Sequence, residues 1–136
     1  MPPLNISAEL KLKNFGKKTE HAFFTVMRET SADFSAYLKD NLSKTGITAQ
    51  GKRRTSPPYS MPYKDSGNLL NATDVIYLEY SSRAVIKAGT DISRAPYGVY
   101  LEYGTSKMLP RPYLLPNGIL FFNRICSRLK NLKGVL

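Results

Sequence analysis

The chain has 136 residues, one cysteine and a formal net charge of +10 at pH 7. This length fits a single domain over residues 1–136, and one cysteine excludes an internal disulfide. No apolar run approaches the ~18 residues of a membrane-spanning helix, and the N-terminus lacks a signal-peptide pattern. We therefore expect a soluble intracellular product that does not contact a membrane.

The positive charge is concentrated in two parts of the chain. Residues 44–64 carry five bases and no acid, and the residues after Glu102 carry six bases and no acid. Such clusters favour polyanions or acidic protein faces as partners, although they would equally serve as a solvated surface. The candidate partner-binding residues are Lys52, Arg53, Arg54, Arg124, Arg128 and Lys130.

The first third of the chain predicts a strand and then a long helix. Residues 4–12 alternate apolar and polar side chains, and this period of two indicates a half-buried strand. From about Asn14 apolar residues recur every three or four positions, which indicates an amphipathic helix. Asn14 or Thr19 can cap its start, and Gly46 is a natural stop. The expected inward stripe is Phe23, Met27, Thr30, Phe34, Tyr37, Leu38 and Leu42.

Residues 44–64 predict a long basic loop. They contain three prolines and two glycines and show no periodicity. A structureless segment longer than ~12–15 residues is uncommon in a compact domain and is usually functional or disordered. We expect this loop to be mobile until it meets a partner.

The second half predicts a short helix, a hairpin and a second long helix. Ser66 resembles the N-cap of a helix that turns Leu69 and Leu70 inward, and residues 74–80 and 83–90 form an antiparallel hairpin. Residues 97–103 fit either a strand or a short helix, and the helix would turn Val99, Tyr100 and Tyr103 inward. The last helix ends at Gly134, and its expected stripe is Ile119, Phe122, Ile125, Cys126, Leu129 and Leu132. This order predicts an α+β fold, with the N- and C-terminal helices packed on a small antiparallel sheet.

Few residues could carry catalysis or bind a metal. His21 is the only histidine and lies in the first helix, while Cys126 falls on an apolar stripe. General-base chemistry needs a placed partner, zinc needs more ligands than one His and one Cys, and no phosphate-binding loop is present. We expect no enzyme activity, no cofactor and no metal.

Residues 100–116, YLEYGTSKMLPRPYLLP, form a segment that we call the elbow. Its prolines hold the preceding residues extended, and Gly104 permits a positive φ. Glu102 and Arg111 either form a buried carboxylate–guanidinium pair or remain separate surface charges. The surrounding tyrosines fit a protein interface or core as well as a nucleic-acid stacking platform.

The elbow also resembles a known signature. The pattern Y-x-x-Y-[VL]-E-[FY]-G-T, a small loop and R-P-[FY]-L-x-P are typical of the tail-completion, or head–tail joining, proteins of long-tailed bacteriophages. An upstream [TS]-G-x-L-x-x-[SA] block and the order of elements are also similar to that family. Asn117-Gly118 departs from the alanine-led start of the family's last helix, so that helix is expected to begin a turn later. The matching positions are Ser66, Gly67, Leu69, Ala72, Tyr97, Tyr100, Leu101, Glu102, Tyr103, Gly104, Thr105, Arg111, Pro112, Tyr113, Leu114 and Pro116.

The resemblance implies a non-enzymatic virion protein, made in the host bacterial cytoplasm, that forms a hexameric ring in the neck. Its partners would be the head connector or stopper and the tail tube or tail terminator, and its lumen would admit packaged DNA. The residues 102–105 and 111–113 would be its structural motif. A small basic nucleic-acid-binding protein remains the alternative, because both classes need basic surfaces.

Overall fold

Three strands and four helices make up the part of the chain that the structure, a computed structural model, describes: residues 4–11, 17–45, 56, 58–62 and 67–131. In chain order the elements are β1 (Leu4–Lys11), α1 (Lys17–Leu42), α2 (Asn68–Ala72), β2 (Thr73–Glu79), β3 (Arg83–Thr90), α3 (Gly98–Tyr103) and α4 (Leu115–Lys130). The α+β class predicted from the sequence is confirmed. No helix within these ranges is long and apolar enough to cross a membrane.

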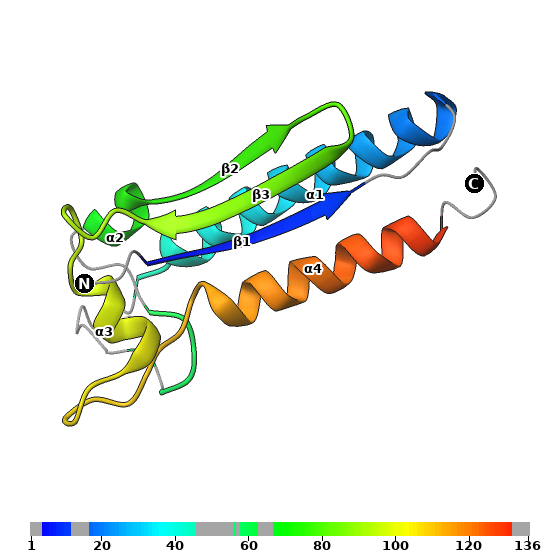
Figure 1. Cartoon of the computed structure of the whole chain (residues 1–136). Helices are drawn as coiled ribbons and strands as arrows, with labels where there is room; N and C mark the ends of the chain where they lie inside the picture. The colour runs from blue at the N-terminus through cyan, green and yellow to red at the C-terminus, as the bar shows by residue number, and fades with distance from the viewer. Residues whose placement is uncertain (1–3, 12–16, 46–55, 57, 63–66, 132–136) are drawn as a thin grey trace.

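The sheet is antiparallel with the strand order β1-β3-β2, so β1 and β2 are its two edges (Figure 1). Leu4 and Thr73 both lie opposite Thr90, on either side of β3. Along β1 the side chains alternate between half-buried and exposed, as the period of two predicts. The predicted hairpin of β2 and β3 is confirmed.

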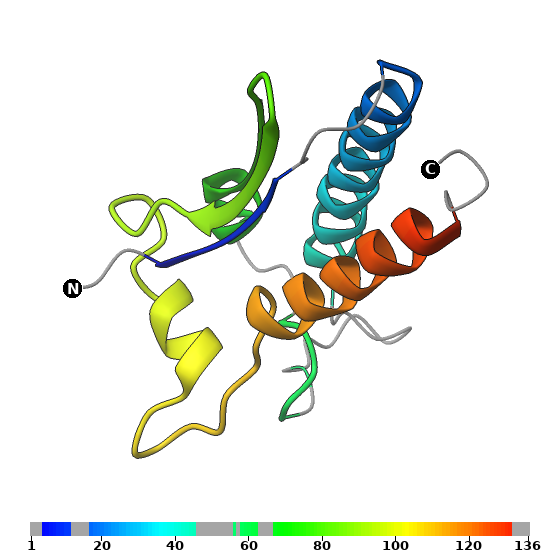
Figure 2. The ribbon, with the colours of Figure 1, turned by 45° about the vertical axis from the view of Figure 1, so that its right-hand side comes forward.

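The two long helices, α1 and α4, lie on the same face of the sheet (Figure 2). Met27 and Leu38, at the centre of the predicted stripe of α1, are almost fully buried. Arg128 of α4 joins the two helices by donating to Thr30 Oγ1 at 2.7 Å and to Asp33 Oδ2 at 3.0 Å. One core cluster draws side chains from β1, α1, α2, β3, the elbow and α4.

One of the two predicted N-caps of α1 is wrong. Thr19 lies inside the helix and is buried, so it is not the cap, while Asn14 and Gly46 lie outside the described residues. The helix ends at Leu42. The Ser43 N–H donates to Lys39 O at 3.1 Å and to Asp40 O at 3.3 Å, and the Ser43 hydroxyl donates to Asp40 O at 2.6 Å. These bonds satisfy carbonyls of the last turn, which have no partner further along the helix.

The short helix α2 follows Gly67, which occupies the N-cap position with φ 86°. Ser66, the predicted cap, lies outside the described residues. Leu69 is buried and Leu70 is half-buried, as predicted. The Lys39 ammonium of α1 donates to Leu70 O at 3.0 Å and to Thr73 O, so a positive charge holds the carboxyl end of α2.

Residues 97–103, left open between strand and helix, form the helix α3. The predicted inward face is wrong for Tyr100 and Tyr103, which are 47% and 69% exposed. Gly98 and Glu102 face the interior instead, because positions four apart share one face of a helix. A Cβ on Gly98 would lie 2.8 Å from the Tyr113 hydroxyl, so only glycine allows this close packing.

The helix α4 begins at Leu115, with no delay at Asn117-Gly118. Pro116 suits the first turn, where its missing N–H is not needed, and Asn117 Nδ2 donates back to Tyr113 O at 2.8 Å. The predicted stripe is half wrong. The side chains of α4 that are buried are Asn117, Phe121 and Ile125, whereas Ile119 and Phe122 are 54% and 40% exposed. Cys126 is half-buried, and Leu132 and Gly134 lie outside the described residues.

Candidate functional site

Glu102 fixes the elbow to the start of α4. Its carboxylate is 6% exposed and accepts three backbone N–H groups, from Tyr113 at 2.8 Å, Leu114 at 3.0 Å and Leu115 at 2.9 Å. A carboxylate at the N-terminus of a helix also meets the positive end of the helix dipole. These partners could not be predicted from the sequence, because they are backbone groups, which no side-chain pattern reveals.

Neither alternative for Glu102 and Arg111 is correct, because Glu102 is buried and is not a surface charge, and it does not pair with Arg111. No ion pair among the described residues joins them. The Arg111 side chain binds residue 56 instead, because its Nε donates to the carbonyl of the buried Ser56 at 2.8 Å. The backbone N–H of Arg111 donates to Leu101 O at 2.6 Å. Since the carboxylate is already satisfied by N–H donors, Arg111 is free to hold the chain at Ser56.

Gly104 makes the turn that follows α3. Its φ of 78° and ψ of 178° lie in a region that is essentially restricted to glycine. A Cβ at this position would also lie 2.9 Å from Pro110 Cδ. Beyond it, Thr105 N–H donates to Met108 O at 2.8 Å and closes a tight loop. The motif glycine is therefore required by the backbone.

Tyr113 anchors the other end of the elbow in the core. It is fully buried, and its hydroxyl is hydrogen-bonded to Thr90 Oγ1 at 2.6 Å, which is in turn bonded to Thr73 Oγ1 at 2.8 Å. Burial raises the pKa of Tyr113, since the charged phenolate would lose its hydration. Together, Glu102 and Tyr113 make the elbow a rigid support.

Part of the predicted loop packs against the elbow. Tyr59 N–H donates to Pro110 O at 2.8 Å, and Tyr59 has a positive φ of 65°. Met61 Sδ accepts Asn117 Nδ2 at 3.3 Å. Lys52, Arg53 and Arg54, with most of residues 44–64, lie outside the described residues, so their partner-binding role and the mobility of the loop stay predictions.

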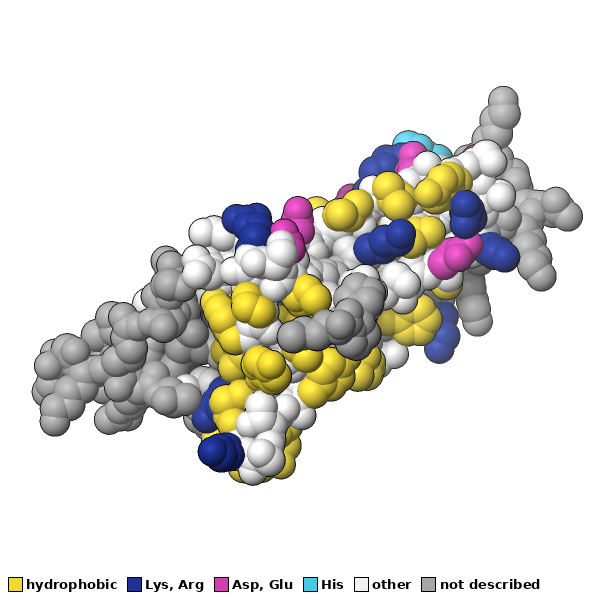
Figure 3. All heavy atoms as spheres, turned by 60° about the vertical axis from the view of Figure 1, so that its left-hand side comes forward, with side chains coloured by type: hydrophobic (Ala, Val, Ile, Leu, Met, Phe, Trp, Pro, Cys, Tyr) yellow, Lys and Arg dark blue, Asp and Glu magenta, His cyan; other side chains and the backbone are white. Residues whose placement is uncertain are grey.

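The elbow and the residues beside it form an exposed projection with large apolar side chains. Its members all carry large side chains that are more than a third exposed, and we call them the tyrosine lobe: Tyr59, Tyr97, Tyr100, Tyr103 and Leu109. Hydrophobic side chains gather on and beside the projection at the bottom of the molecule, where Lys or Arg side chains also lie (Figure 3). Of the three elbow tyrosines, Tyr113 belongs to the core, whereas Tyr100 and Tyr103 are exposed. An interface role for the exposed tyrosines stays a prediction.

The three candidate bases of α4 have different surroundings. The Arg128 guanidinium pairs with Asp33, and Arg124 Cζ lies 4.5 Å from the centre of the Phe121 ring, a cation–π contact. Lys130 is exposed in the last turn. These bases therefore do not form one uniform cationic surface, since the Arg128 guanidinium is bound to Thr30 and Asp33 of α1.

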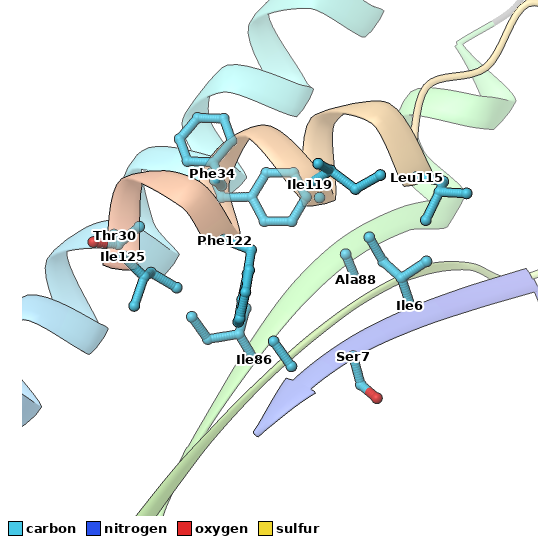
Figure 4. A pocket seen from close by; sticks show the side chains of 13 residues that line it. Ile6, Ser7, Thr30, Phe34, Ile86, Ala88, Leu115, Ile119, Phe122 and Ile125 are labelled. Carbon is cyan, nitrogen blue, oxygen red and sulfur yellow. The ribbon is translucent and has the colours of Figure 1, made fainter. Parts of the chain in front are cut away.

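A groove separates α4 from the edge strand β1. It has a volume of about 270 Å³. Phe122 and Leu115 of α4 point toward Ile86 and Ile6 of the sheet across this gap (Figure 4). The residues that line it are Ile6, Ser7, Ala8, Thr30, Phe34, Ile86, Ala88, Leu115, Gly118, Ile119, Phe121, Phe122 and Ile125. The sequence did not predict this groove, because it assigned Ile119 and Phe122 to the core.

Neither His21 nor Cys126 belongs to a group of possible metal ligands. His21 is exposed on α1, and no group of three or more His, Cys, Asp or Glu residues in the described ranges could hold a metal ion.

Comparisons with protein-family models, curated proteins and solved structures found no match to this chain.

Proposed function

We propose that the chain is a structural, non-enzymatic virion protein of a long-tailed bacteriophage. Its subunits form a ring, with six copies as the expected number, that joins or completes the tail at the head connector. The neighbours are the connector or stopper on one side and the tail tube or tail terminator on the other. The protein is made in the host cytoplasm and resides in the neck of the virion, where packaged DNA passes its lumen.

The role of the motif residues in the elbow supports this proposal. Glu102 binds the start of α4, Gly104 has a backbone conformation that other residues avoid, and Tyr113 fills the core. The resemblance to the neck proteins therefore rests on residues that each build the projecting lobe, and does not reflect composition alone. A rigid support that presents exposed aromatic side chains suits a protein whose work is docking.

Charge reversal of the loop tests the joining function. In the phage that encodes the chain, Lys52, Arg53 and Arg54 are changed together to glutamate. Surface changes alter stability by only ~0.5 kcal/mol, so circular dichroism and melting should match the wild type. Electron microscopy of the lysate should show filled heads and finished tails that are not joined. Normal infectious particles would exclude the loop as the docking element.

The nucleic-acid-binding alternative is tested by salt. A protein that neutralises several phosphates loses affinity steeply as salt rises, whereas a ring subunit held by apolar contacts keeps its self-association. Measuring DNA affinity and oligomeric state over the same salt series separates the two. Tight DNA binding by a monomer, with a steep salt slope, would favour the alternative.

A further inference from the structure

The groove between β1 and α4 is uncharged, although the whole chain is strongly basic. None of its thirteen lining residues carries an ionisable side chain, while the net charge is +10. A polyanion needs cations facing it, so nucleic acid does not suit this groove. Its volume of about 270 Å³ is at the lower end of the ~300–1,000 Å³ of typical small-molecule sites. Apolar side chains of a protein partner suit it better.

The chain itself carries such side chains on the tyrosine lobe. Tyr103, Tyr59 and Leu109 are 69%, 68% and 52% exposed. With roughly 200 Å² for each fully exposed aromatic side chain, the five members of the lobe present on the order of 500 Å². A monomer's largest apolar patch is typically ~300–600 Å² and is often functional. The lobe is therefore as large as the functional patches that monomers carry, which makes it a candidate contact surface.

We propose that the groove of one subunit binds the tyrosine lobe of a second copy of this chain. The inference deepens the proposed ring and rests on it, since it names the surfaces by which neighbouring subunits meet. None of the five lobe residues or the thirteen groove residues is charged, so a contact confined to them places no like charges against each other, although Lys107 lies between Tyr103 and Leu109 in the chain. Lobe and groove are different surfaces, and such a contact can repeat around a ring until it closes.

The size of the contact predicts its strength. On the groove side the exposed apolar side chains are Leu115, Ile119 and Phe122, at 51%, 54% and 40%. Lobe and groove together offer on the order of 800 Å², less than the ~1,200–2,000 Å² of a stable pairwise interface. A single contact is therefore weak, and closing the ring, where each subunit makes two contacts, raises the effective concentration. We expect association that depends on protein concentration.

Analytical sedimentation of the purified chain at protein concentrations from about 10 µM to about 1 mM measures this association. The highest concentration is sufficient to detect a Kd of ~1 mM. Ile119→Lys places a charge in the groove, and Tyr103→Lys places one on the lobe. Leu120→Lys is the matched control, because Leu120 is the next residue on α4, is 40% exposed and does not line the groove. Each replaced side chain is exposed, so circular dichroism should match the wild type for all three variants.

Ile119→Lys and Tyr103→Lys should each raise the Kd at least tenfold, and the control should leave it unchanged. A mixture of the two variants should form one-to-one pairs that do not grow, because only one intact lobe–groove contact can form. A wild-type chain that stays monomeric at about 1 mM overturns the inference, and so does association that neither variant weakens. Both results leave the joining test in lysates to decide the proposed function.

Other outcomes distinguish the lobe–groove contact from the proposed ring. Lobe-dependent association that closes at two copies supports the contact and contradicts the hexameric ring. Lobe-dependent association into a closed ring supports both.

Discussion

Replacing Glu102 by alanine tests whether this carboxylate holds the elbow in place. The change leaves the N–H groups of Tyr113 and Leu114 buried without an acceptor, while the exposed Leu115 can turn to water. A buried donor without a partner costs about 1–3 kcal/mol, so the two together predict a loss of about 2–6 kcal/mol in the free energy of unfolding. That is a large part of the ~5–15 kcal/mol that stabilises a domain. The melting temperature should fall by roughly 5–20 °C.

Three further variants sharpen the test. Glu102→Gln keeps one oxygen for the two buried donors and should lose only about 1–2 kcal/mol. Glu79→Ala removes an exposed carboxylate, whose side chain is 37% exposed and pairs with Arg28 at 3.0 Å, and should cost about 0–1 kcal/mol. Arg111→Ala leaves a single carbonyl, that of Ser56, without this donor and should cost less than Glu102→Ala.

Urea unfolding at a constant m-value gives each difference directly. The expected order of loss is Glu102→Ala, then Glu102→Gln, then Glu79→Ala. A Glu102→Ala protein that unfolds at the same urea concentration as Glu79→Ala would refute the reasoning. Equal losses in the free energy of unfolding for Glu102→Ala and Arg111→Ala would instead indicate that the two side chains form a buried ion pair.

Three other changes have definite outcomes. Gly104→Ala forces a side chain into a glycine-only conformation and toward Pro110, and we expect a loss of about 1–3 kcal/mol in thermal unfolding; a variant as stable as the wild type would contradict this. Burial raises the pKa of Tyr113, and burial together with the Glu79 hydrogen bond raises the pKa of Tyr77 to about 12. The contribution of these two neutral tyrosines to the free energy of unfolding is therefore complete below the unfolded pKa of ~10. It is lost as pH rises from there through the folded pKa values. Tyr113→Phe should unfold at a higher pH than wild type in an alkaline titration followed by tyrosinate absorbance, and an identical midpoint would count against it. Arg128→Ala removes both the half-exposed pair with Asp33 and the hydrogen bond to the buried Thr30 hydroxyl; it should cost about 1–3 kcal/mol, and a variant as stable as the wild type would contradict a role in joining the helices.

The regular elements followed from the sequence because their signals are local. The alternation in β1 and the stripe of α1 each report which side of one element is apolar, and burial follows from that (Leu4, Met27 and Leu38 are buried). The hairpin of β2 and β3 likewise needs only two alternating runs joined by a short turn. From these elements and their order the α+β class was predictable.

The face of α4 was decided by tertiary packing. The run ILFF at 119–122 places apolar residues on every side of the helix, so periodicity cannot select the inward face. Gly118 lets the helix approach Ile6, since a Cβ there would lie 2.3 Å from Ile6 Cδ1. Arg128 reaches Thr30 of α1 at 2.7 Å. With α4 in this position, Phe121 is buried and Ile119 lies at the groove.

The elbow shows the same division. Its prolines and Gly104 determined a stiff turn, because proline fixes φ and glycine admits positive φ regardless of context. The partners of Glu102 depended on where the chain brings the N–H groups of residues 113–115, eleven to thirteen positions away. Backbone donors are the same in every residue except proline. Only the folded path of the chain could therefore decide which of them the carboxylate would meet.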